Sequence, residues 1–259
     1  MTTPPLFWFD GIGTVQTGDT LAVTGAEAHH IVQVRRLRVG DLLTLADGAG
    51  AFAIGQITAA HGDWAQVTVE VISPGLVTPS VPQLVLVQAL AKDRRDEAAV
   101  AAATGLGVDA VIPWQANQSV VRWFPDKTTK GRERWQRLVR AESKVARRPR
   151  LPEVEAPLRT EALAARLAEA TGRAGALSLV LHEEASRGLE TALRPALASH
   201  VPAIYLLVGP EGGIGEPELE TLMEAGCQPV RLGREVLRSG FAGPAALAVL
   251  NFQLGRWAK

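Results

Sequence analysis

Short apolar segments alternate with helical patterns from residue 84 to the end of the chain, and this alternation constrains the fold most. The apolar segments fall at 84–89, 110–112, 177–181, 203–208 and 228–232. Helices are expected at 93–105, 131–146, 161–170, 216–225 and 241–257. Continuous apolar strands separated by helices are typical of a mainly parallel sheet that is covered on both faces. The sequence therefore predicts an α/β fold for this part of the chain.

The first 72 residues have a different pattern, in which short strands surround one helix. Strands are expected at 20–23, 42–45, 51–57 and 65–71, with a helix at 26–34 and turns at Asp47-Gly48 and Gly62-Asp63. This pattern predicts a small β-barrel. A linker is expected from Ser73-Pro74-Gly75 to Pro79 and Pro82, because these residues interrupt both helices and strands. We therefore expect one domain at 1–74 and a second at 82–259.

Composition excludes several classes of protein. Cys227 is the single cysteine, so the chain has no intrachain disulfide and no multi-cysteine metal site. His182 and Glu183 have no third ligand at a recognisable spacing, so no metal is expected. No apolar run reaches the roughly 18–20 residues of a membrane span, and the N-terminus lacks the pattern of a secretion signal. We expect a cytoplasmic protein without a membrane contact.

The formal net charge is zero, but basic residues gather in one segment. Between residues 132 and 150, Glu133 and Glu142 face a much larger basic set: Arg132, Arg134, Arg137, Arg140, Lys144, Arg147, Arg148 and Arg150. Such an excess favours binding to a phosphate backbone, although a solvated helix face would show the same run of charge. Trp123 and Trp135 are candidates for stacking on bases, although core packing is the more common role of tryptophan.

The most informative motif is the loop Gly209-Pro210-Glu211-Gly212-Gly213-Ile214-Gly215, which follows an apolar strand and precedes a helix. Glycines there let a ligand lie directly against the backbone. The spacing matches neither a Rossmann fingerprint nor a Walker loop. Two further loops, at Leu232-Gly233 and at 236–243, also follow strands. Ligands of open α/β sheets bind at the carboxyl ends of strands, so the three loops predict a site that recognises its ligand mainly through backbone groups.

These motifs, in this order, resemble the RsmE family of ribosomal RNA small subunit methyltransferases, within the SPOUT superfamily. The resemblance covers nearly the whole chain. It includes the segment 29–41, Gln88-Ala89-Leu90 with Lys92, the segments 103–108 and 119–121, Arg134-Trp135, Arg147-Arg148 and the segment 151–154, as well as the three loops.

The resemblance implies a C-terminal SPOUT domain with a trefoil knot, preceded by a PUA-like β-barrel that helps to hold RNA. It implies a homodimer that binds S-adenosylmethionine and methylates N3 of a uridine in 16S ribosomal RNA, free or within the assembled 30S subunit. The residues expected to bind the cofactor are Leu207, Gly209, Pro210, Gly212, Gly213, Leu232, Gly233, Leu237 and Ala242. The expected RNA-binding residues are His30, Arg36, Arg38, Lys92, Arg147, Arg148 and Arg150.

Two residues are the candidates for the chemical step. Arg238 is expected to orient the uracil carbonyl or to stabilise developing negative charge, although a capping or phosphate contact would also place an arginine there. Glu211 would either accept a proton or organise the glycine loop. No residue of the sequence is identified as the general base.

The sequence also departs from the family pattern, at Ala102, Gly105, Gln118, Ala141, Val145 and Phe241. Phe241 replaces a threonine whose hydrogen bond phenylalanine lacks. These departures favour an alternative: a knotted RNA-binding or ribosome-assembly protein with reduced or no turnover. The intact glycine loops favour the enzyme, because a binding protein does not need a cofactor site.

Overall fold

The structure is a computed structural model that describes residues 3–60 and 66–258, and it contains two compact units. The first comprises Met1–Thr78 and Arg140–Leu151, and the second comprises Pro79–Val139 and Pro152–Lys259. Residues 140–151, which the sequence places with the second domain, thus pack with the first unit. The expected turn at Gly62-Asp63 and the first residue of the expected strand 65–71 lie outside the described residues.

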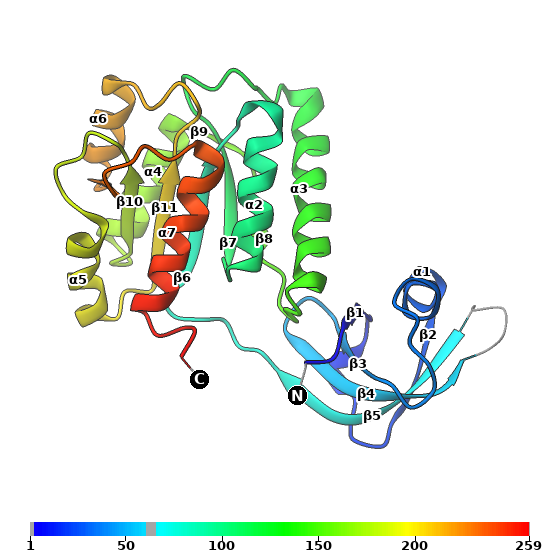
Figure 1. Cartoon of the computed structure of the whole chain (residues 1–259). Helices are drawn as coiled ribbons and strands as arrows, with labels where there is room; N and C mark the ends of the chain where they lie inside the picture. Colours follow the sequence, from blue (N-terminus) through cyan, green and yellow to red (C-terminus); the bar gives the residue numbers. More distant parts are fainter. Residues whose placement is uncertain (1–2, 61–65, 259) are drawn as a thin grey trace. The chain divides into compact units, whose positions relative to one another are not determined.

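The first unit is built on a five-stranded mixed sheet in the order β1-β3-β4-β5-β2 (Figure 1). Only the pair β1 and β3 is parallel among these strands, and the other pairs are antiparallel. The strands are β1 (Leu6–Trp8), β2 (Thr20–Thr24), β3 (Leu42–Ala46), β4 (Ala51–Ala60) and β5 (Gln66–Leu76).

One helical segment lies at residues 25–34, close to the expected helix at 26–34, and it packs against this sheet. It consists of α1 (Gly25–His29) and a π-helical turn over His30–Val34, and a single turn of 3-10 helix lies at Ile12–Thr14. Ala28 and Ile31 are wholly buried, in a core with the inward side chains of the strands. On β5 these side chains alternate as Val67, Val69 and Val71, the period of a half-buried strand.

The prediction of a linker from Ser73 is wrong for its first part, because β5 continues to Leu76. The register between β4 and β5 shifts between Ile54 and Gly55, so the pairing continues past this irregularity as far as Pro74 and beyond. At Gly75 a Cβ atom would lie 2.4 Å from the Phe52 ring, so glycine leaves the space that this ring occupies. Strand β5 therefore accommodates Pro74 and Gly75, although these residue types usually interrupt strands.

The second unit contains a seven-stranded sheet in which every strand pair is parallel. The order is β12-β10-β11-β6-β7-β8, and β9 also pairs with β7. The strands are β6 (Gln83–Ala89), β7 (Ala110–Gln115), β8 (Glu153–Val154), β9 (Leu158–Arg159), β10 (Leu177–Leu181), β11 (Ala203–Val208) and β12 (Gln228–Val230). The predicted α/β fold with a parallel sheet is confirmed.

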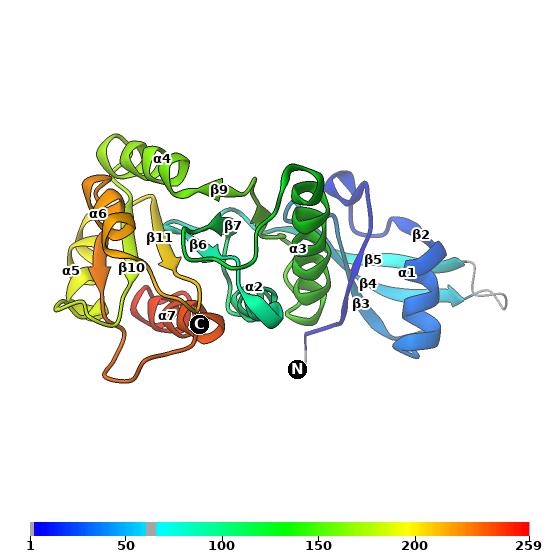
Figure 2. The same ribbon diagram turned by 90° about the horizontal axis from the view of Figure 1, so that it is seen from above.

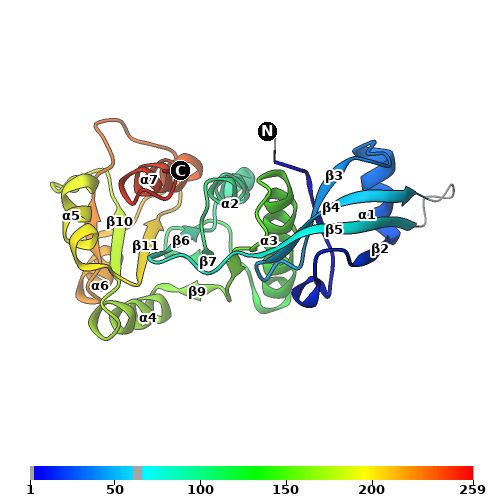
Figure 3. The same cartoon turned by 90° about the horizontal axis from the view of Figure 1, so that it is seen from below.

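Helices cover both faces of this sheet (Figure 2). They are α2 (Arg95–Gly105), α3 (Pro125–Val145), α4 (Thr160–Gly172), α5 (Leu189–Ser199), α6 (Glu216–Glu224) and α7 (Ser239–Gln253), and a 3-10 turn over Lys92–Arg94 precedes α2. Helices α2 and α7 lie together on one face and α4 and α6 on the other, as the opposite view also shows (Figure 3). None of the described helices is long and apolar enough to cross a membrane.

The core of the second unit lies between the sheet and these helices. Leu163 and Leu167 of α4 and Leu222 of α6 are wholly buried against one face. Cys227 joins the same core, where burial raises the pKa of its thiol to about 12, so it acts as a small apolar residue. On the other face Gly243 brings α7 close to the sheet, since a Cβ there would lie 2.8 Å from Leu86 Cδ1.

Candidate functional site

The carboxyl ends of β10, β11 and β12 meet at one edge of the parallel sheet, and two adjoining pockets lie there. One is lined by residues that follow β10 and β12, and the other by residues that follow β10 and β11. Both include Leu181, His182, Glu183, Leu237 and Ala242, so they form one continuous site. Each encloses about 370 Å³ of empty space, a volume that includes space open to solvent, so both are shallow and open to the surface.

Backbone hydrogen bonds hold the loops of this site in place. The His182 amide donates to the Val230 carbonyl at 3.0 Å, and the Arg231 amide donates to the Arg187 carbonyl at 2.8 Å. These bonds join the loops that follow β10 and β12. In the glycine loop, the Gly213 amide donates to the Pro210 carbonyl at 3.0 Å.

Two glycines of this loop are required for different reasons. Gly213 has a φ of 76°, in the left-handed region that favours glycine, and the space beside it is open. At Gly209 a Cβ would lie 2.7 Å from Ile214 Cγ1, so glycine permits the chain to fold back on itself.

Most of the predicted cofactor residues line this site. They are Gly209, Pro210, Gly213, Leu232, Gly233, Leu237 and Ala242. Leu207 lies in the core beneath the loop and is wholly buried. Gly212 is not among the lining residues, and a Cβ there would lie 2.9 Å from Gln118 Oε1.

The sequence reasoning missed several residues that line the site, notably His182, Glu183 and Ser239. His182 and Glu183 directly follow β10, and the rule that ligands bind at the carboxyl ends of parallel strands would have found them. Ser239 is the first residue of α7, it is 8% exposed, and its hydroxyl has no hydrogen-bond partner within the described chain.

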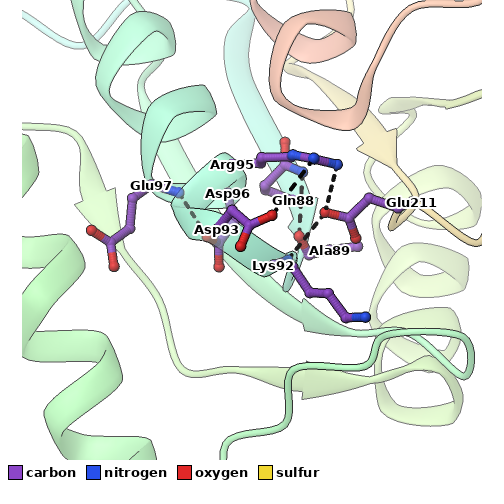
Figure 4. A network of polar contacts seen from close by, with 8 residues as sticks. All are labelled: Gln88, Ala89, Lys92, Asp93, Arg95, Asp96, Glu97 and Glu211. Carbon is purple, nitrogen blue, oxygen red and sulfur yellow. Dashed lines mark hydrogen bonds and ion pairs between the residues drawn. The ribbon is translucent and has the colours of Figure 1, made fainter.

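Glu211 connects the glycine loop to the loop that follows β6 (Figure 4). Its Oε1 accepts a hydrogen bond from the Lys92 amide at 3.1 Å, and it lies 3.5 Å from Arg95 Nη1. Arg95 also lies 3.6 Å from Asp93 Oδ2. The carboxylate therefore ties two adjacent strand-end loops together, which favours the organising role over proton transfer.

The loop after β6 is strained. Asp93 and Arg94 have φ values of 54° and 57°, which non-glycine residues rarely adopt. Next to them Asp96 is buried, and its Oδ1 accepts a hydrogen bond from the Glu97 amide at 2.9 Å. Burial raises the pKa of Asp96 to about 6, although backbone hydrogen bonds from Glu97 and Ala91 oppose this shift.

Arg238 precedes α7 and lies outside the lining of both pockets. Its side chain is exposed, and its carbonyl accepts hydrogen bonds from the Phe241 and Ala242 amides. It stands between Leu237 and Ser239, which both line the site. The structure therefore places Arg238 at the rim.

The expected RNA-binding residues are divided between the units. Lys92 belongs to the second unit, whereas the first contains His30, Arg36, Arg38, Arg147, Arg148 and Arg150. Arg150 has a structural contact, because its guanidinium donates two hydrogen bonds to the Val77 carbonyl. Trp135 is buried and packs edge to face against Trp123 at 5.6 Å, so the core interpretation of Trp135 is correct.

Comparison with known proteins agrees with this geometry. A family described as an RNA methyltransferase domain matches residues 78–251, and one described as an RNA methyltransferase PUA domain matches residues 23–75. The chain is 37% identical to a ribosomal RNA small subunit methyltransferase E of Mycobacterium bovis, over 97% of this chain and 93% of the relative. The relative named in the same way from Bacillus subtilis is 29% identical, with 92% of each chain covered.

Solved structures show the same architecture. A methyltransferase of Legionella pneumophila, solved with its bound cofactor SAM, superposes with a TM-score of 0.78 at 25% identity, over 97% of this chain and 98% of the other. A ribosomal RNA small subunit methyltransferase E of Neisseria gonorrhoeae gives 0.79 at 24% identity, with 98% of each chain covered. The resemblance drawn from the motifs is confirmed. The chain belongs to the RNA methyltransferase family that includes ribosomal RNA small subunit methyltransferase E.

Proposed function

We infer that this protein transfers a methyl group from S-adenosylmethionine to small-subunit ribosomal RNA, at N3 of a uridine. The observation that carries this proposal is the continuous, backbone-lined site at the ends of β10, β11 and β12, in a chain that belongs to an RNA methyltransferase family.

The residues present fit the cofactor. Apolar side chains such as Ile214, Leu232 and Leu237 suit the adenine and ribose, and the open backbone at Gly213 suits their polar edges. The unpartnered hydroxyl of Ser239 provides a hydrogen-bonding group for the ligand. When bound, S-adenosylmethionine supplies an electrophilic methyl group on a sulfonium sulfur.

The side chains of the protein position the base. Uridine N3 carries a hydrogen, so this proton must pass to solvent as N3 takes the methyl group, while the sulfur of the cofactor would keep the electron pair of the bond that breaks. A guanidinium at Arg238 stabilises the negative charge that develops on the uracil carbonyls. Glu211 is a positioning residue, because it fixes the glycine loop against Lys92 and Arg95.

The first unit provides the basic side chains that hold the RNA. They are His30, Arg36, Arg38, Arg147, Arg148 and Arg150, with Lys92 in the second unit. The trefoil knot, the homodimer, the 30S subunit as substrate and the cytoplasmic location all stay predictions.

Calorimetry with S-adenosylhomocysteine tests the site, with two glycines as a matched pair. Gly213 and Gly255 both have positive φ values, 76° and 66°, and open space beside them, but Gly255 lies beyond the end of α7. Gly213→Val should abolish binding, because a branched side chain blocks the backbone and disfavours this φ. Gly255→Val introduces the same type of backbone strain, and this variant should bind S-adenosylhomocysteine as the wild type does.

Mass mapping of modified uridines then tests the reaction, using small ribosomal subunits that lack the modification as substrate. Appearance of N3-methyluridine is the expected result. A wild-type protein that binds no S-adenosylhomocysteine would instead support the RNA-binding or assembly protein without turnover.

A further inference from the structure

A second cavity lies entirely within the first unit, apart from the cofactor site. It is lined by the start of β1, the π-helical turn, Arg35 and residues 141–147. Its volume is about 1130 Å³, counting space open to solvent. One wall is apolar and includes Leu6 and the exposed Val145. The remaining lining is basic.

Lys144 lines this cavity, and its charge is balanced by an ion pair with Glu27 behind the lining. Lys144 Nζ lies 2.7 Å from Glu27 Oε2 and 3.1 Å from Glu27 Oε1, and 2.9 Å from His30 Nδ1. It also lies 5.2 Å from the centre of the Phe7 ring. An ammonium group has three N–H donors, and these three acceptors use them. Lys144 therefore has no donor left for a ligand.

His30 gains a defined orientation from this contact. Because Lys144 donates to Nδ1, the neutral ring carries its proton on Nε2, which is then a donor. The ring packs edge to face against Phe7 at 5.5 Å. Burial, followed by the charge of Lys144, lowers the pKa of His30. The imidazole is thus held neutral with one N–H available.

Two guanidiniums at the cavity carry the remaining charge. Arg35 and Arg147 are exposed, and neither makes an ion pair or a side-chain hydrogen bond within the described chain. Arg147 has a φ of 55°, and its amide donates to the Lys144 carbonyl at 3.2 Å. The two unpaired guanidiniums and the imidazole N–H are thus the donors that the cavity offers to a ligand. This set suits one phosphate group, whose oxygens accept several charged hydrogen bonds at once.

We propose that this cavity is a nucleotide subsite for single-stranded RNA, in which Arg35 and Arg147 share one phosphodiester and the apolar wall receives the adjoining sugar or base. His30 Nε2 donates a third hydrogen bond to the phosphate. Single-stranded RNA is the ligand that offers an unpaired base beside its phosphate. The subsite rests on the proposed RNA-modifying function, and it assigns a part of the substrate contact to a defined cavity.

A double-mutant cycle tests the subsite, with a labelled short oligouridylate as the probe and its Kd measured at several salt concentrations. Arg35→Gln and Arg147→Gln should each weaken binding about tenfold, as loss of a charged hydrogen bond does. Each should lower the slope of log K against log salt by about 0.7. If both side chains hold one phosphate, the double variant should lose well under the product of the single effects.

Arg173→Gln is the matched control, because this exposed arginine of the second unit loses the same charge. It should leave the Kd near that of the wild type. If the Kd of the double variant rises by the product of the two single effects, RNA binds a diffuse basic surface and the subsite is overturned. The same follows if Arg173→Gln weakens binding as much as the variants of Arg35 and Arg147. Full displacement of the probe by an equal concentration of inorganic phosphate would show a simple anion site and also overturn it.

Binding of S-adenosylhomocysteine separates this proposal from the proposed function. All these variants should retain it, because no substituted residue lines the cofactor site. Wild-type protein that binds the oligouridylate with the expected coupling but transfers no methyl group would refute the reaction and leave the subsite standing.

Discussion

Asp96 is an acid that is 5% exposed, in the first turn of α2. Its pKa in the folded protein is about 6, above its ordinary value of 3.8. The folded state therefore holds this proton more tightly than the unfolded chain. Protonated Asp96 therefore contributes ~3 kcal/mol to the free energy of unfolding. This contribution is complete below pH 3.8 and is lost as the pH rises to about 6.

Asp96→Asn removes this dependence, because an amide does not titrate. The difference in unfolding free energy between the variant and the wild type should grow in favour of the variant as the pH rises through this window. Urea denaturation at a series of pH values measures it. A constant difference would mean that Asp96 titrates in the folded protein as it does in the unfolded chain.

Arg238 lies at the rim of the cofactor site, so its effect on the methylation rate can be measured separately from its effect on cofactor affinity. Arg238→Ala should lower the single-turnover methylation rate by roughly 10²–10³, the usual effect of losing a group that stabilises transition-state charge. Affinity for S-adenosylhomocysteine should change little, because Arg238 lies outside the pocket lining. Arg238→Lys should rescue only partly, since an ammonium lacks the planar fork of arginine. A defect confined to cofactor affinity would contradict the role.

At the scale of elements, the contact of α7 with the sheet depends on Gly243. A Cβ at this position would lie 2.8 Å from Leu86 Cδ1 and 3.3 Å from Val208 Cγ2. Gly243→Ala should therefore cost about 1–3 kcal/mol of unfolding free energy, as overpacking of a core does. Since Val208 also lines the cofactor site, S-adenosylhomocysteine should bind more weakly.

Gly172 is the matched control for this substitution. It is also a helical glycine, at the end of α4, but a Cβ there meets no atom within 4 Å. Gly172→Ala should be neutral or slightly stabilising. Thermal unfolding of the two variants gives the comparison, and equal melting temperatures would show that the sheet yields to the extra methyl group.

The elements that the sequence predicted are those with a strong local signal. The strands 84–89, 177–181 and 203–208 are continuous apolar runs, and the structure places β6, β10 and β11 there. The missed elements lack such a signal. Helix α5 has a proline at position 195, and β8 and β9 are two residues long and depend on pairing with β7. Pairing is a tertiary effect that no local pattern encodes.

For the candidate site, too, the sequence predicted the residues with a local signal and missed the contacts between distant residues. Glycines at strand ends indicate backbone recognition, so the loops at 209–215 and 232–233 could be found from spacing alone. His182 and Glu183 belong to no motif, but they directly follow the predicted strand 177–181, so the strand-end rule identifies them once it is applied to every parallel strand. The contact between Glu211 and the Lys92 amide joins residues 119 positions apart, which periodicity cannot reveal.

At the scale of the whole molecule, an exposed apolar face on α7 agrees with the expected homodimer. Phe241, Val249 and Phe252 are exposed and fall on one face at helical spacing. Exposed apolar clusters mark association surfaces. Phe252→Asp should therefore shift the protein to a monomer in sedimentation experiments. Leu76→Asp, at an exposed apolar residue of β5, should not. Dimers that persist in the Phe252 variant would place the interface elsewhere.

Strand β11 follows β10 in the sequence but lies between β10 and β6 in the sheet, and this order has a consequence during synthesis on the ribosome. The emerging chain presents β6, β7 and β10 first, each able to fold only in part. Until Val208 has left the exit tunnel, β6 keeps one unpaired edge and β10 keeps both, because β12 is made later still. Unpaired strand edges are sites of aggregation. Nascent chains of this protein should therefore need protection late in translation, and a chain truncated before β11 should be degraded faster than the full chain in a pulse-chase experiment.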